Sequence, residues 1–75
     1  MLEGATVDRE VIGYRMKLFA LLDRFIAGER SVIAREAQAH ADALMCLMEE
    51  APLQKRAKID NLIDRYESLR LASGD

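Results

Sequence analysis

The single histidine of the chain, His40, is the residue whose chemistry is easiest to define. An imidazole titrates near neutral pH, so a histidine placed between helices can make their packing sensitive to pH. A metal site would need a second ligand one turn away on the same face, and position 44 is a leucine. We interpret His40 as a packed residue that fixes the register between helices. A pH-sensitive interface is the alternative, and we expect no metal site.

Three sulfur-containing residues lie close together, at Met45, Cys46 and Met48. They could offer soft ligands to copper, but at helical spacing Cys46 points away from the face that carries His40. We therefore interpret them as packing residues. The sequence has no serine in a glycine elbow and no glycine-rich loop that could hold a phosphate, and Cys46 has no activating neighbour in sequence. We expect no enzymatic activity, no cofactor and no small-molecule substrate.

A basic cluster, formed by Lys55, Arg56 and Lys58, comes after the only proline, Pro52. Such a cluster at the start of a helix could bind a phosphate, a nucleic acid or an acidic partner. The net charge of −2 supplies no long-range attraction for nucleic acid, and two glutamates lie close by at positions 49 and 50. A nucleic-acid-binding regulator is therefore the alternative function, and a protein-binding module is favoured.

Length and composition limit the structures that these residues can build. A chain of 75 residues forms a single domain, residues 1–75. Chains of this size rarely gain more than about 3–5 kcal/mol from a core of their own, so we expect a second copy to complete the fold. One cysteine allows no internal disulfide and fits a reducing compartment. With no apolar run of membrane-spanning length and no signal peptide, we predict a cytoplasmic protein without a membrane partner.

The stretch from Ile33 to Met48 is the clearest helix. Its apolar residues recur at the i, i+3, i+4, i+7 spacing of one helical face, and His40 lies in the middle of that face. Alanines occupy positions 34, 37, 39, 41 and 43. Alanine favours helix and has little bulk, so another helix can approach this one closely.

An earlier helix is expected from about residue 6, with Thr6 as its N-cap. Its apolar residues, from Val11 to Ile26, cover more than half of the helix circumference, so we expect neighbours on two sides. Asp8 and Arg15 project into this apolar band, where an unpaired charge would be costly.

Gly28 is the only break signal before the next helix, and Ser31 could be the N-cap of that helix. We favour a break at Gly28. The apolar stripes on either side remain nearly in phase, however, so one continuous first helix up to about residue 50 stays open as the alternative.

Pro52 gives a firmer boundary, because proline disfavours helix before it and suits the first turn of the helix after it. The expected helices span about 6–27, 31–50 and 52–71.

We therefore predict an all-α, antiparallel bundle of three helices, or of two with a long first helix, completed by homodimerisation. The predicted function is that of a small non-enzymatic interaction module (an adaptor, inhibitor, chaperone or regulator) that binds itself and another protein. The residues expected to build its interface and its specificity are Asp8, Arg15, Leu18, Leu22, Phe25, Ile33, Ala37, His40, Leu44 and Leu47.

Overall fold

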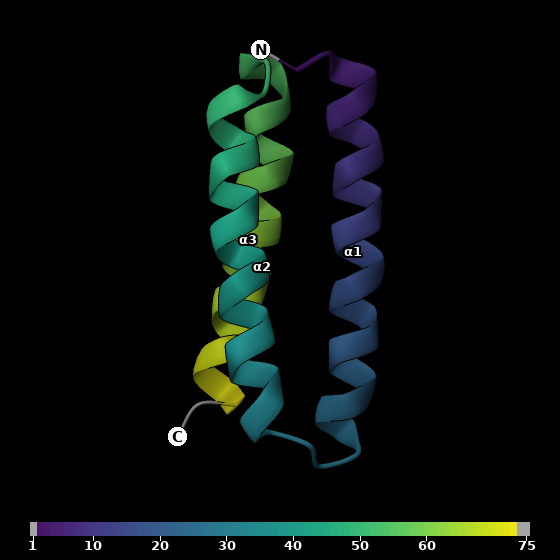
Figure 1. Ribbon diagram of the computed structural model, residues 1–75, viewed down its shortest axis with the longest axis vertical. Helices are drawn as coiled ribbons and strands as arrows, with labels where there is room; N and C mark the ends of the chain where they lie inside the picture. The colour runs from purple at the N-terminus through teal and green to yellow at the C-terminus, as the bar shows by residue number, and fades with distance from the viewer. Residues whose placement is uncertain (1, 74–75) are drawn as a thin grey trace.

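The computed structural model describes residues 2–73, which form three helices, each antiparallel to the next along the chain, joined by short connections (Figure 1). Helix α1 spans Gly4–Ile26, α2 spans Ser31–Glu50 and α3 spans Arg56–Ser73, with a short 3-10 helix, η1, at Leu53–Lys55 before α3. No strand occurs in the described residues. The predicted all-α bundle of three helices is confirmed, and the continuous first helix is excluded.

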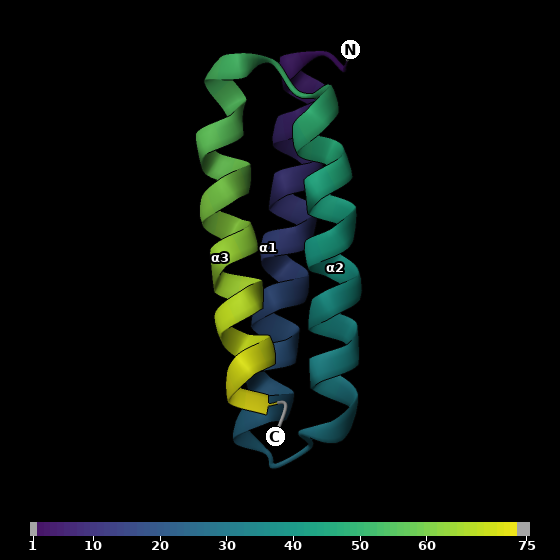
Figure 2. The same ribbon diagram turned by 90° about the vertical axis from the view of Figure 1, so that its left-hand side faces the viewer.

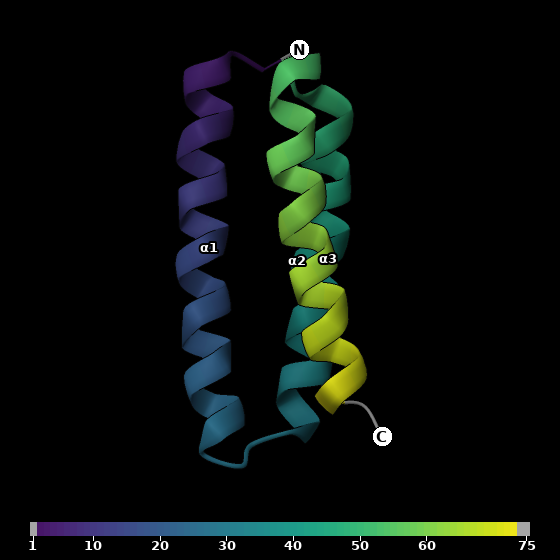
Figure 3. The same ribbon diagram turned by 180° about the vertical axis from the view of Figure 1, so that it is seen from behind.

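The helices do not pack evenly. Helices α2 and α3 approach each other closely along their length, whereas α1 stands further from both (Figures 1 and 3). The close approach occurs where α2 buries Ala37 and Ala41, whose small side chains let α3 come near. This confirms the close packing that the alanines predict. Figure 2 shows that α1 lies behind the α2–α3 pair and faces both helices.

A single core fills the space between the three helices within one chain. Large aliphatic side chains and one tyrosine supply most of it, and Ile33, Leu44, Ile59 and Tyr66 are fully buried. The remaining buried residues are Val7, Val11, Leu18, Leu21, Ala37, Ala41, Leu47, Ala51, Leu62, Ile63 and Leu69. The core therefore closes without a second copy, and homodimerisation stays a prediction.

The break between α1 and α2 falls at Gly28, which has a φ of 96°. The amide of Gly28 donates to the carbonyl of Phe25, and that of Glu29 donates to the carbonyl of Arg24. These two bonds form a Schellman motif, which ends a helix at a residue in the left-handed conformation. Because only glycine adopts that conformation without strain, Gly28 ends α1 even though the apolar stripes continue in phase.

Both predicted N-caps are wrong. Helix α1 begins at Gly4 with Glu3 as its N-cap, and the amide of Leu2 just before it donates to the carbonyl of Glu50 at the end of α2 (2.9 Å). In α2 the N-cap is Arg30, and Ser31 is the first helical residue. The boundary at Pro52 is confirmed, although the turn directly after it is η1 rather than α-helix.

None of the helices within residues 2–73 has a stretch long and apolar enough to cross a membrane.

The Schellman motif gives the first prediction. Substitution Gly28→Ala should lower the free energy of unfolding by about 1 kcal/mol, because a β-carbon is strained at positive φ. Gly13→Ala is the matched control, since Gly13 lies inside α1 and no neighbouring side chain comes within 4 Å of its added β-carbon. That change should raise the free energy of unfolding by roughly 0.5–1 kcal/mol. Urea denaturation measures the free energy of unfolding of both variants. If Gly28→Ala is as stable as the wild type, the Schellman motif at Gly28 is contradicted.

Candidate interaction surface

One aromatic residue from each helix meets at the centre of the bundle. The imidazole of His40, on α2, lies 5.7 Å from the ring of Tyr14 on α1 and 5.4 Å from the ring of Tyr66 on α3, measured between centroids. The interplanar angle of 69° between His40 and Tyr14 is typical of edge-to-face packing, whereas His40 and Tyr66 are tilted at 58°. His40 is half-buried and packs within one chain. This cluster links α1 to the closely packed α2–α3 pair.

The hydroxyl of Tyr66 donates a hydrogen bond to the backbone carbonyl of Tyr14, which attaches α3 directly to α1. Burial, reinforced by Tyr14, raises the pKa of Tyr66 to about 12. The phenol therefore keeps its proton, and the bond keeps its donor, throughout the physiological range. Sequence reasoning missed this role of Tyr14. The available signal was its place seven residues from both Val7 and Leu21, which are buried on the same face of α1.

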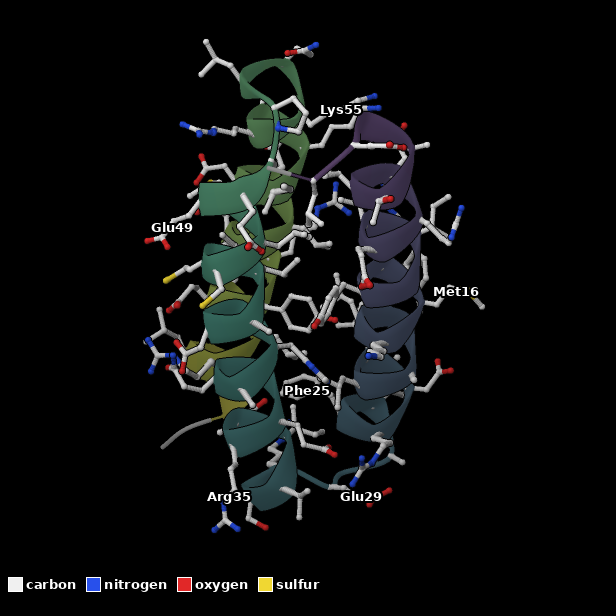
Figure 4. All side chains as sticks on the ribbon, turned by 45° about the horizontal axis from the view of Figure 1, so that its top comes forward. Met16, Phe25, Glu29, Arg35, Glu49 and Lys55 are labelled. Carbon is white, nitrogen blue, oxygen red and sulfur yellow. The ribbon has the colours of Figure 1, made fainter. Side chains whose placement is uncertain are left out.

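The apolar residues predicted to form an interface lie together, but inside the chain. Five of them are buried in its own core: Leu18, Ile33, Ala37, Leu44 and Leu47. Leu22 and Phe25 are partly buried and pack against that core. Figure 4 shows Phe25 between the helices. A second copy could reach the five buried residues only if the helices separated.

Asp8 and Arg15, the two charged residues predicted to give the interface its specificity, lie in different surroundings: Asp8 is ion-paired and Arg15 is exposed. The carboxylate of Asp8 accepts from the ammonium of Lys55 at 3.0 Å, so it joins α1 to η1 across the top of the bundle (Figure 4). Arg15 is exposed and lines a cleft between α1 and α3.

The predicted basic cluster is divided by the fold. Lys55 is paired with Asp8, and Nε of Arg56 donates to the carbonyl of Ala51 at 3.3 Å. Lys58 lies apart from them, exposed on α3. Because Asp8 neutralises Lys55, the cluster offers a nucleic acid less free charge than its sequence indicates.

An exposed apolar stripe runs along α1, from Met16 on its outer side to Phe19, which also borders α3. Ile12, Met16 and Phe19 are 55%, 67% and 54% exposed, and Ile26, 82% exposed, extends the stripe to the end of the helix. Figure 4 shows Met16 pointing away from the bundle. The sequence predicts neighbours on two sides of this broad apolar band. Within the chain, α2 and α3 cover only the inner side, because α1 meets them along one face.

Two hollows lie side by side between α1 and α3. The larger, which we call the apolar groove, has a volume of about 500 Å³ and lies where the lower end of α3 leans away from α1 (Figure 3). Its apolar lining is Leu18, Phe19, Leu22 and Phe25 from α1, and Leu69 and Ala72 from α3. The smaller, which we call the basic cleft, has a volume of about 180 Å³ and is lined by Arg15, Lys58, Asn61, Leu62 and Arg65.

The sulfur-containing residues do not gather into a site. Met45 and Cys46 are exposed on α2, while Met48 packs against the core. Among residues 2–73, no three histidine, cysteine or carboxylate side chains lie close enough together to hold a metal ion.

The environment of His40 gives the second prediction. Burial lowers the pKa of His40 from its ordinary 6.5, Lys17 lowers it further, and Glu36 offsets part of the shift. Just below pH 6.5 the unfolded chain therefore binds more protons than the folded chain, and the free energy of unfolding should fall as the pH drops. We expect a lower midpoint of urea denaturation at pH 5.5 than at pH 7.5.

The variant His40→Gln should reduce this difference in midpoint, because glutamine does not titrate. An equally large difference in wild type and variant would show that other groups cause the pH dependence.

Comparisons with known protein families, with curated protein sequences and with solved structures find no match to this chain. The surfaces of the bundle are therefore the basis on which its function is inferred.

Proposed function

We propose that this chain is a small non-enzymatic protein–protein interaction module, an adaptor, chaperone, inhibitor or regulator, that pairs with a second copy of itself through the outer side of α1. The observation that carries the proposal is the exposed apolar stripe of Ile12, Met16 and Phe19 on a helix whose opposite side is already buried. Exposed apolar residues that line up in this way are typical of docking surfaces.

Charge complementarity favours a second copy as the occupant. Arg9 and Asp23 lie seven residues before and after Met16, so the three share one side of α1. Both charged residues are exposed, and neither forms an ion pair within residues 2–73. When two α1 helices align antiparallel with Met16 against Met16, each Arg9 faces Asp23 of the other copy. The stripe is thus complementary to itself in that orientation.

The size of the surface favours a weak, reversible dimer. Helix α1 has 23 residues and a length of about 35 Å. One face of such a helix covers less area than the roughly 800 Å² per partner of a standard interface. Because the core closes within one chain, the monomer needs no partner in order to fold. We expect dissociation in the micromolar range or weaker.

Light scattering over a concentration series tests the pairing. The mass should rise from that of one chain to that of two, and Met16→Glu should keep it at one chain, because two like charges would meet at the dimer axis. Met45→Glu is the matched control, since Met45 is 42% exposed on α2 and should not affect the mass. A wild-type monomer at every concentration would contradict the proposal.

Charge reversal tests the antiparallel orientation. Arg9→Asp and Asp23→Arg should each weaken the dimer, because each places like charges opposite one another. The double variant should restore it, since the pairs then form with reversed signs. A double variant weaker than both single variants would exclude the antiparallel alignment about Met16.

A further inference from the structure

The basic cleft contains positive charge without a counter-charge. Arg15 reaches it from α1, and Lys58 and Arg65 from α3, while no acidic residue lines it. None of the three cations forms an ion pair among residues 2–73. Three like charges around one hollow repel each other, and an anion bound between them would relieve that repulsion. The cleft therefore suits carboxylates, which arginine binds through two parallel hydrogen bonds.

The apolar groove continues directly from this cleft, and Arg65 lines both. Helices α1 and α3 run in the same direction (Figure 1), so on both helices the basic residues of this surface come before the apolar ones. On α3 the stripe Lys58, Leu62, Arg65, Leu69 and Ala72 passes from basic to apolar, and on α1 Arg15 precedes the apolar wall that begins at Leu18. The combined surface has one basic end and one mainly apolar end, whose polar lining residues are Asp64, Arg65 and Ser68.

We infer that this surface binds an amphipathic helix of another protein, with its apolar side chains in the apolar groove and its acidic residues in the basic cleft. This inference rests on the proposed function as an interaction module, and it names a second partner on the α3 side of α1, where Phe19 belongs to both surfaces. A helix fits because it can lie along the space between two parallel helices and complete a four-helix arrangement. Acidic residues fit because the cleft supplies three cations, whereas the carboxylate of Asp64 lines the apolar groove and not the cleft.

Synthetic peptides test the inference by fluorescence anisotropy. One helical peptide carries leucines at i, i+4, i+7 and i+11 with two glutamates one turn beyond the last leucine, and a second carries the glutamates one turn before the first leucine. A third has glutamine in place of both glutamates. One of the two glutamate peptides should bind more tightly than the glutamine peptide, by about tenfold for the loss of charge-assisted hydrogen bonds.

Variants separate the two ends of the site. Lys58→Gln with Arg65→Gln should weaken the preferred glutamate peptide about tenfold and leave the glutamine peptide unchanged, because only carboxylates use the cleft. Ala72→Glu should weaken both peptides by placing a charge in the apolar groove. The matched controls, Arg35→Gln and Ala39→Glu, change exposed residues of α2 and should alter neither affinity. Equal binding of all three peptides, or unchanged binding to Ala72→Glu, would overturn the inference.

The same titration with a single-stranded oligonucleotide covers the other anionic partner. The inference would be overturned in favour of a phosphate ligand if the chain binds the oligonucleotide but no peptide. In that case the double variant Lys58→Gln with Arg65→Gln should lose oligonucleotide binding. Each titration is repeated with Met16→Glu, which should bind peptide as wild type does. If the chain dimerises normally but binds no peptide, only this site is rejected. If the chain binds peptide but never dimerises, only the self-pairing is rejected.

Discussion

One contact joins all three helices: the meeting of Tyr14, His40 and Tyr66, one from each helix. The hydroxyl of Tyr66 bonds to the backbone of α1, and the imidazole of His40 packs between the two phenol rings. All three rings lie between the helices, where α1 stands further from α2 and α3 than those two helices stand from each other.

The unequal spacing has a direct effect on the surface. Since Ala37 and Ala41 let α3 close against α2, those two helices share most of their apolar surface with each other. Helix α1 then contacts the pair along one side only. Its apolar band is wider than that side, so Met16 and its neighbours remain exposed, and the end of α1 borders the apolar groove. The surfaces proposed for binding are thus a consequence of the packing of the core.

Sequence reasoning predicted the features that depend on local chemistry. Glycine at position 28 ends α1, and Pro52 separates α2 from η1 and α3. The residues that α3 buries, Ile59, Leu62, Ile63, Tyr66 and Leu69, follow the spacing of one helical face. These results depend on dihedral preferences and helical periodicity, which act over a few residues.

Features that depend on distant residues could not be predicted in the same way. The partner of Asp8 is Lys55, which lies 47 positions along the chain, and no periodicity connects the two. The basic cleft likewise joins Arg15 to Lys58 and Arg65, so it exists only once α1 and α3 lie side by side. Periodicity also could not show which part of the apolar band on α1 is covered, because that depends on how far α1 stands from its neighbours.

The core closes within one chain, and in the proposed dimer the contacts between chains use the outer side of α1. Amide chemical shifts of the ¹⁵N-labelled chain, recorded from dilute to concentrated solution, test this arrangement. We expect shifts that change with concentration around Arg9, Met16 and Asp23 and stay constant along the buried side of α2. Changes centred on Ile33, Ala37 and Leu44 would contradict it, because they would show that the helices separate and exchange between copies.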